Sequence, residues 1–127
     1  RAYHFLKENQ RVADQVAALG NNDFSRFLRL VRDSGNSSFK WLQNVYSTTN
    51  IREQGVSLAL ALTEDYIEKA GEGACRVHGG GFAGTILVFL PSVSVPGYIP
   101  LMESVFGESS VKVLNIRSQG TWCLNTF

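Results

Sequence analysis

The sequence predicts an α+β domain in which helices pack on one face of a mostly antiparallel sheet. The first half of the chain repeats its apolar residues at helical spacing, whereas segments after Gly73 alternate apolar and polar residues as strands do. The chain has 127 residues, of which 44% are hydrophobic, and this is enough for one domain with a core. We therefore expect a single domain over residues 1–127.

The helices of the first half are predicted by their apolar faces and their end signals. Phe24, Phe27, Leu28 and Val31, for example, follow the i, i+3, i+4, i+7 pattern of a helix with one buried face. The expected helices are residues 1–19, 24 to about 35, 39–46 and 51–71, with caps at Asp23, at Ser37 or Ser38, and at a capping box formed by Asn50 and Glu53.

The second half predicts strands separated by one further helix. Cys75 and Val77 alternate with Arg76 and His78, which is typical of a strand whose two faces differ. Residues 85–90 are apolar at nearly every position, and this predicts an interior strand. We also expect a helix over 96–106 that ends at Gly107, a strand over 111–116 and a last short strand over 121–124.

Charge and composition exclude several classes of function. The formal net charge of +1 gives no electrostatic reason to expect binding to nucleic acid or to an anionic membrane surface. The longest apolar runs are far shorter than the roughly 20 residues that span a bilayer, and no signal peptide is visible. Cys75 and Cys123 are not spaced as a zinc or redox motif, so we expect two reduced thiols in a cytoplasmic protein. The absence of an initiator methionine suggests a piece of a larger protein.

A glycine cluster between the first two strands is the strongest candidate for a functional site. It comprises Gly79, Gly80, Gly81 and Gly84. A dinucleotide-binding motif would open a helix, but a β-branched strand follows here. A protein-kinase glycine loop needs a lysine on the next strand, and a Walker loop needs Gly-Lys-Ser/Thr, and neither is present. What remains is a hairpin loop whose backbone N–H groups could face an anion, or which could let a neighbouring backbone pack closely.

The segment GACRVHGGGFAGTILVFLP resembles the third motif of the GHMP small-molecule kinases, and specifically that of galactokinases. Arg76, Gly79, Gly80, Gly81, Phe82 and Gly84 match positions of that motif. RAYHFLKENQRV resembles the galactokinase Arg-Ala-x-His helix, and VKVLNIRSQGTWCL resembles the closing strands. Val77, His78 and Ala83 depart from the motif, which indicates a divergent bacterial branch. The resemblance implies the ferredoxin-like fold of a GHMP-kinase C-terminal domain.

The resemblance also implies a function for the parent protein, namely ATP-dependent phosphorylation of the anomeric hydroxyl of galactose. ATP and Mg2+ would be bound mainly by an N-terminal domain that also supplies the catalytic aspartate, so we expect neither catalytic residues nor metal ligands in this chain, which alone should be inactive. Two alternatives stay open: a sugar-sensing regulator without turnover, and a kinase for another sugar such as N-acetylgalactosamine. The expected partners are a small sugar and ATP, with no nucleic acid and no membrane.

Within this chain, the resemblance places the phosphate-site loop at Gly79, Gly80, Gly81, Phe82 and Gly84. Arg76 and His78 could line the same cleft. Arg76 could instead form a surface ion pair, and His78 could simply be hydrogen-bonded beside the turn. Phe82 is expected to act as a hydrophobic plug that holds the loop to the core.

Overall fold

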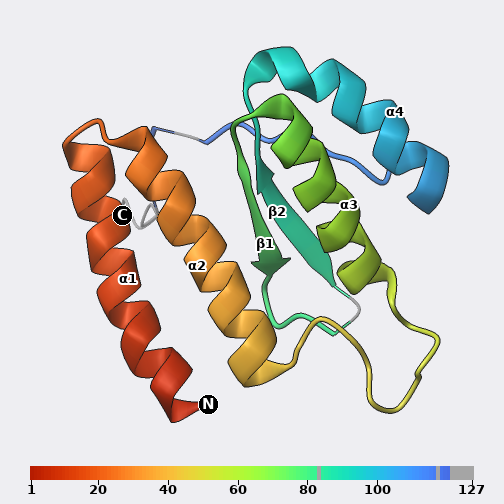
Figure 1. Cartoon of the computed structure of the whole chain (residues 1–127), viewed down its shortest axis with the longest axis horizontal. Helices are drawn as coiled ribbons and strands as arrows, with labels where there is room; N and C mark the ends of the chain where they lie inside the picture. The colour runs from red at the N-terminus through yellow and green to blue at the C-terminus, as the bar shows by residue number, and fades with distance from the viewer. Residues whose placement is uncertain (83, 117, 121–127) are drawn as a thin grey trace, which may run out of the picture.

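The computed structural model describes residues 1–82, 84–116 and 118–120. Its helices and strands confirm the α+β class (Figure 1). In chain order, the elements are α1 (Ala2–Gly20), α2 (Phe24–Leu42), α3 (Gly55–Ala70), β1 (Ala74–His78), β2 (Thr85–Phe89), the 3-10 turn η1 (Ser92–Ser94) and α4 (Val95–Phe106).

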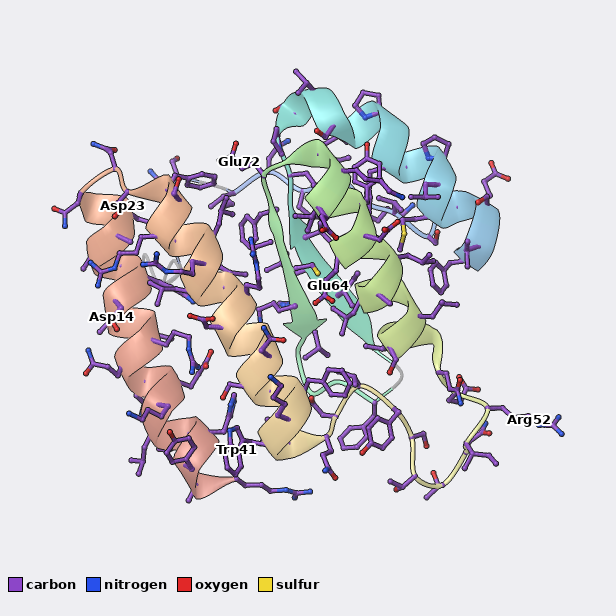
Figure 2. All side chains as sticks on the ribbon, viewed as in Figure 1. Asp14, Asp23, Trp41, Arg52, Glu64 and Glu72 are labelled. Carbon is purple, nitrogen blue, oxygen red and sulfur yellow. The ribbon has the colours of Figure 1, made fainter. Side chains whose placement is uncertain are left out.

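Helices α1 and α2 form a hairpin and lie side by side (Figure 1). The predicted cap at Asp23 is confirmed, because its carboxylate accepts a hydrogen bond from the backbone N–H of Arg26. At the other end of the pair, Trp41 lies beside the beginning of α1 (Figure 2), and its ring centroid is 5.0 Å from that of Tyr3. The two helices are therefore connected by the short turn before Asp23 and are in contact at their other ends through Tyr3 and Trp41.

The predicted break of α2 near Gly35 is wrong, and so is the separate helix over 39–46. Helix α2 continues through Gly35 to Leu42, and Ser37 and Ser38 lie inside it. A Cβ atom at Gly35 would lie 2.8 Å from the Cβ of Arg76, so the glycine lets the helix approach β1 closely. A glycine that serves packing is easily misread as a helix end.

Helix α3 begins later than predicted. Asn50 donates from its side chain to the Glu53 carboxylate at 3.3 Å, and its Oδ1 accepts from the backbone N–H of Arg52 at 3.2 Å. These bonds form a local turn. They do not form the predicted capping box, in which each of the two side chains accepts a hydrogen bond from the backbone N–H of the other residue. The helix starts at Gly55 and ends at Ala70, and the φ of +82° at Gly71 confirms the predicted stop.

Strands β1 and β2 pair antiparallel, and helices cover both faces of this pair. Cys75 and Val77 pack with residues of α3 such as Leu60, whereas Ala74 packs with Leu28 of α2. In Figure 1, β1 lies between α2 and α3. The prediction of helices on one face is therefore wrong, because alternate side chains of β1 are apolar or small enough to pack against helices on both sides.

Helix α4 matches its predicted range and ends at Gly107 as expected. It packs beside α3, where the hydroxyls of Tyr98 and Thr63 are 2.7 Å apart and the Tyr66 hydroxyl donates to the backbone O of Ser94 at 2.6 Å. None of the helices in the described parts of the chain is long and apolar enough to cross a membrane.

The strand predicted over 111–116 is not formed. Residues 111–116 carry no regular secondary structure, and their backbone pairs with no strand in the part of the chain that the structure describes. Alternation in the sequence alone cannot form a strand without a neighbour to accept its hydrogen bonds. The last strand predicted, over 121–124, lies outside the described residues, so the ferredoxin-like topology stays a prediction.

Candidate functional site

The glycine loop joins β1 to β2 and has an unusual backbone. Gly79 and Gly81 have φ values of +68° and +81°, and Phe82 also has a positive φ, +62°. Residues with a side chain rarely adopt this left-handed backbone conformation, and a bulky aromatic residue does so only when its surroundings hold it there. Gly79 and Gly81 are therefore required by backbone geometry, whereas Phe82 must be held in place by its neighbours.

The neighbour that holds the loop is Asn44, in the connection between α2 and α3. The backbone N–H of Phe82 donates to the backbone O of Asn44. At Gly81 there is no room for a side chain, because a Cβ atom would overlap that same oxygen and lie 2.9 Å from the Cβ of Asn44. One side of the loop is therefore packed against the chain itself.

The other side of the loop is open. Gly80 is exposed, its φ lies outside the left-handed region, and none of the described residues has a heavy atom within 4 Å of the position of a Cβ there. Gly79 is exposed in the same way. Nothing within the described chain explains why residue 80 is a glycine. A group from outside it can therefore approach the backbone at this point.

Phe82 and His78 border the open side. Phe82 is 48% exposed, which does not fit the expected hydrophobic plug that holds the loop to the core. His78, at the end of β1, is exposed and pairs with Thr85 across the hairpin. The structure therefore places both predicted residues at the glycine loop, His78 directly before Gly79 and Phe82 directly after Gly81.

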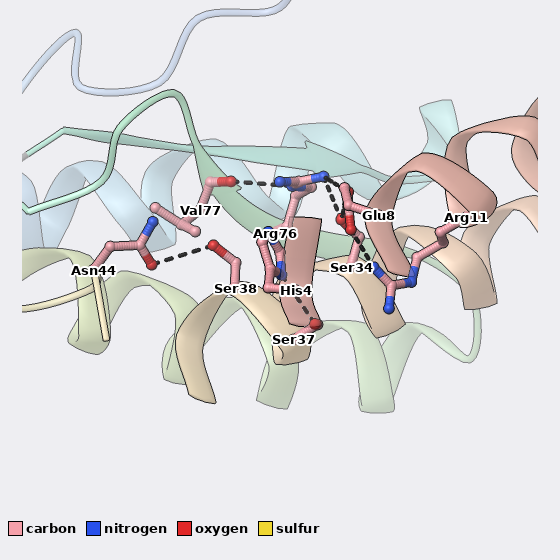
Figure 3. A network of polar contacts seen from close by, with 9 residues as sticks. All are labelled: His4, Glu8, Arg11, Ser34, Ser37, Ser38, Asn44, Arg76 and Val77. Atoms are coloured by element: carbon pink, nitrogen blue, oxygen red, sulfur yellow. Dashed lines mark hydrogen bonds and ion pairs between the residues drawn. The ribbon is translucent and has the colours of Figure 1, made fainter. Parts of the chain in front are cut away.

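Arg76 is not brought to the loop, because its guanidinium points toward α1 and α2 (Figure 3). It donates to the carboxylate of Glu8 at 3.2 Å and to the hydroxyl of Ser34, while its Nε donates to the backbone O of Val77 at 3.1 Å. Ser34 and Arg11 also donate to Glu8. The charge of Arg76 is thus paired inside the molecule, and this network fixes β1 to both helices.

The Glu8 carboxylate is stabilised in its ionised form. Burial alone would raise its pKa, but the hydrogen bond from Ser34 and the positive charges of Arg11 and Arg76 outweigh burial. The pKa of Glu8 therefore lies below its ordinary value of 4.5. At neutral pH, the network contains one carboxylate between two guanidinium groups.

Cys75 lies on the opposite face of β1 and has no chemical role in this site. It is a free, buried thiol, and burial, aided by the charge of Glu64, raises its pKa to about 12. The thiol stays protonated and packs as a small apolar side chain. Cys123 lies outside the described residues.

A hollow lies at the same end of the molecule as the glycine loop (Figure 1). A shallow hollow of about 320 Å³ follows Asn44 along the chain and is lined by Tyr46, Ser47, Ile51, Gln54 and Ser57. Arg52 extends away from this connection into solvent (Figure 2). Within residues 1–82, 84–116 and 118–120, no three His, Cys, Asp or Glu side chains are grouped so that they could hold a metal ion.

Sequence reasoning missed Asn44 and Ser38 as parts of this site. A single asparagine in a loop carries no periodic signal, and its role depends on a contact across 36 positions of the chain. The only signal was indirect: three successive glycines imply that some other backbone comes close.

The fold and the loop together define an α+β domain with an exposed, glycine-lined hairpin loop. Comparison with known proteins adds a relationship. The chain is 33% identical over 92 residues to a galactokinase of Mycobacterium tuberculosis, a match that covers 72% of this chain and 22% of that protein. It is 34% identical over 91 residues to galactokinases of Mannheimia succiniciproducens and Haemophilus influenzae, with 72% of this chain and 21% of each relative covered.

These matches show that the chain is related to galactokinases over most of its length. The matched segment spans about a fifth of the length of these curated relatives. No family model matches the chain, and no solved structure matches it.

Proposed function

We propose that this chain is part of the C-terminal domain of a galactokinase-type sugar kinase. The parent protein would transfer a phosphoryl group from ATP to the anomeric hydroxyl of galactose in the cytoplasm. The relationship to galactokinases supports the kinase class, and the match of the glycine loop to the third motif of GHMP kinases supports its place in that family.

The observation that carries the proposal is the open backbone at Gly80. This position is exposed, a Cβ atom there would have no described heavy atom within 4 Å, and the φ of Gly80 does not require a glycine. Phosphoryl transfer depends mainly on positioning the reactants and on stabilising charge on the phosphoryl oxygens. A bare backbone at the edge of an interdomain cleft would let the nucleotide phosphates, or the loop that binds them, come into direct contact with this chain.

The remaining site residues have supporting roles in this proposal. Gly79, Gly81, Phe82 and Gly84 shape the loop, and His78 lines its edge. Arg76 orients β1 through Glu8 rather than binding phosphate, because its charge is already paired. Mg2+ bound with ATP would neutralise charge on the phosphates, and its ligands would lie in other parts of the protein, as would the catalytic aspartate. We therefore expect the isolated chain to have no kinase activity.

The test uses the full-length protein with ATP and, in turn, galactose, glucose and N-acetylgalactosamine. We expect galactose to be phosphorylated, and Gly80→Val to lower kcat on the order of 10²-fold because a side chain would displace the group that contacts the loop. Gly20→Val makes the same change at an exposed glycine with open space around it and should leave kcat unchanged.

Three outcomes would contradict parts of this proposal. Wild-type kcat and nucleotide KM in Gly80→Val would show that the loop is only a turn. Binding of sugar and ATP without turnover would favour the sensor. A preference for N-acetylgalactosamine over galactose would change the substrate and keep the kinase class.

A further inference from the structure

Asn44, in the α2–α3 connection, is hydrogen-bonded to the glycine loop through both its main chain and its side chain. Its backbone O accepts the N–H of Phe82, and its Nδ2 donates to the backbone O of Gly80 at 3.4 Å. Its Oδ1 accepts from the hydroxyl of Ser38, on α2, at 3.2 Å. The loop is therefore linked through Asn44 to the last turns of α2.

Burial makes these bonds important. Asn44 is only 4% exposed, and Ser38 is also buried. A buried amide costs free energy unless its polar atoms are hydrogen-bonded, so the side chain is stable in one orientation, in which its donor faces Gly80 and its acceptor faces Ser38. That orientation fixes where the carbonyl of Asn44 lies.

The loop has a conformation that needs such a support. Phe82 has a left-handed backbone, which is costly for an aromatic residue, and this residue is about half exposed, so packing offsets little of that cost. Gly81 has no Cβ atom, and this lets Asn44 come within bonding distance of the loop. Asn44 and the loop are thus complementary in shape, because Asn44 occupies the space that a side chain at Gly81 would need.

We propose that Asn44 is a positioning residue that holds residues 80–82 in their open conformation before any ligand arrives. Its own contacts are to the loop and to α2, so it acts on a ligand only through the exposed backbone of Gly79 and Gly80. The effect on turnover rests on the proposed function, whereas the effect on the loop does not. A group that binds to a preformed loop does not have to supply the free energy of ordering it.

The experiment compares three variants of the full-length protein. Asn44→Leu removes both side-chain hydrogen bonds and keeps a branched side chain with the same number of heavy atoms. Ser38→Ala removes only the donor to Asn44 and keeps a good helix former in α2, so it remains informative if Asn44→Leu folds poorly. Asn36→Leu is the matched control, because Asn36 is an exposed asparagine on α2.

Hydrogen exchange is measured at the amide of Phe82 and at the amide of Val77, in β1, together with kcat and both KM values. In Asn44→Leu, we expect exchange at Phe82 to rise on the order of threefold to tenfold, which corresponds to one net hydrogen bond, while exchange at Val77 stays unchanged. In an active enzyme, kcat should fall on the order of tenfold while the sugar KM stays within about twofold. Ser38→Ala should change the same quantities less, and Asn36→Leu should change none of them.

Two results would overturn the inference. Wild-type exchange at Phe82 in both Asn44→Leu and Ser38→Ala would show that Asn44 does not hold the loop. A rise at Phe82 and Val77 together, with a lower Tm, would show a general loss of stability instead of positioning. If the wild-type protein phosphorylates no sugar, the proposed function fails separately, and the exchange measurement still decides whether Asn44 holds the loop.

Discussion

The two faces of β1 differ in how they hold the same strand. On one face, Cys75 and Val77 are buried in an apolar cluster with α3. On the other face, Arg76 bonds to Glu8 of α1 and to Ser34 of α2 (Figure 3). The strand then runs directly into the glycine loop, so both faces determine where this loop begins.

This difference separates two physical tasks. Burial of apolar area is the larger source of free energy, but it is not directional. Hydrogen bonds to a guanidinium contribute less net free energy, yet they fix the direction and register of the strand. We therefore expect substitutions in the apolar cluster on the α3 face to change mainly stability, and substitutions in the network of Arg76, Glu8 and Ser34 on the α2 face to have smaller effects that depend on charge and pH.

The largest expected effect is that of Val77→Ala. Val77 is 1% exposed, and its removal takes apolar contacts from the centre of the cluster and leaves a small cavity. The free energy of unfolding should fall by about 2–3 kcal/mol, measured by urea denaturation. Val93→Ala is the control, because Val93 is 89% exposed, and it should change stability by less than about 0.5 kcal/mol. Equal effects of Val77→Ala and Val93→Ala would show that the burial of Val77 in the cluster with α3 does not stabilise the fold.

The same contrast explains how much of the fold the sequence could predict. The faces of β1 follow from the simple alternation of Cys75 and Val77 with Arg76, and the C-terminal ends of α1, α3 and α4 follow from local signals such as Gly71 and Gly107. Gly35 and the segment 111–116 were misread because their states depend on tertiary neighbours. Local sequence does not record whether a glycine faces a strand or whether a strand has a partner.

The second expected effect is that of Arg76→Met, on the polar face. This substitution removes the hydrogen bonds from the guanidinium to Glu8 and Ser34 but leaves Glu8 paired with Arg11. We therefore expect the free energy of unfolding to fall by about 1–2 kcal/mol. A double-mutant cycle with Glu8→Gln should give a coupling energy of about 1 kcal/mol.

The matched control for Arg76→Met is Lys69→Met. Lys69 pairs with Asp65 at 2.6 Å, and both side chains are largely exposed. Exposed pairs contribute little, so this control should change stability by less than about 0.5 kcal/mol. If Arg76→Met and Glu8→Gln were additive, the observed ion pair would not couple α1 to β1.

The site was predictable where it follows local sequence and not where it depends on distant contacts. Gly79, Gly81 and Phe82 stood out as a motif, and their backbone conformation gives a physical reason for two of the glycines. Asn44 could not be found, because its partners lie 36 and 38 residues away along the chain. The direction of Arg76 was equally hidden, since its partner Glu8 lies 68 residues away.

The smallest expected effect is the pH dependence of the Glu8 network. The folded protein lowers the pKa of Glu8 below the ordinary value of 4.5, so folding favours the ionised carboxylate. This contribution to stability is complete above the unfolded pKa and is lost as the pH falls through the lowered folded pKa.

The free energy of unfolding is measured by urea denaturation for wild type and Glu8→Gln from neutral pH to below 4.5. Their difference should be largest near neutral pH and should shrink toward acid. In an Arg76→Met background it should shrink less, because one of the charges that lower the pKa is missing. A difference that stays constant with pH, or grows toward acid, would show that Glu8 acts through packing rather than through its charge.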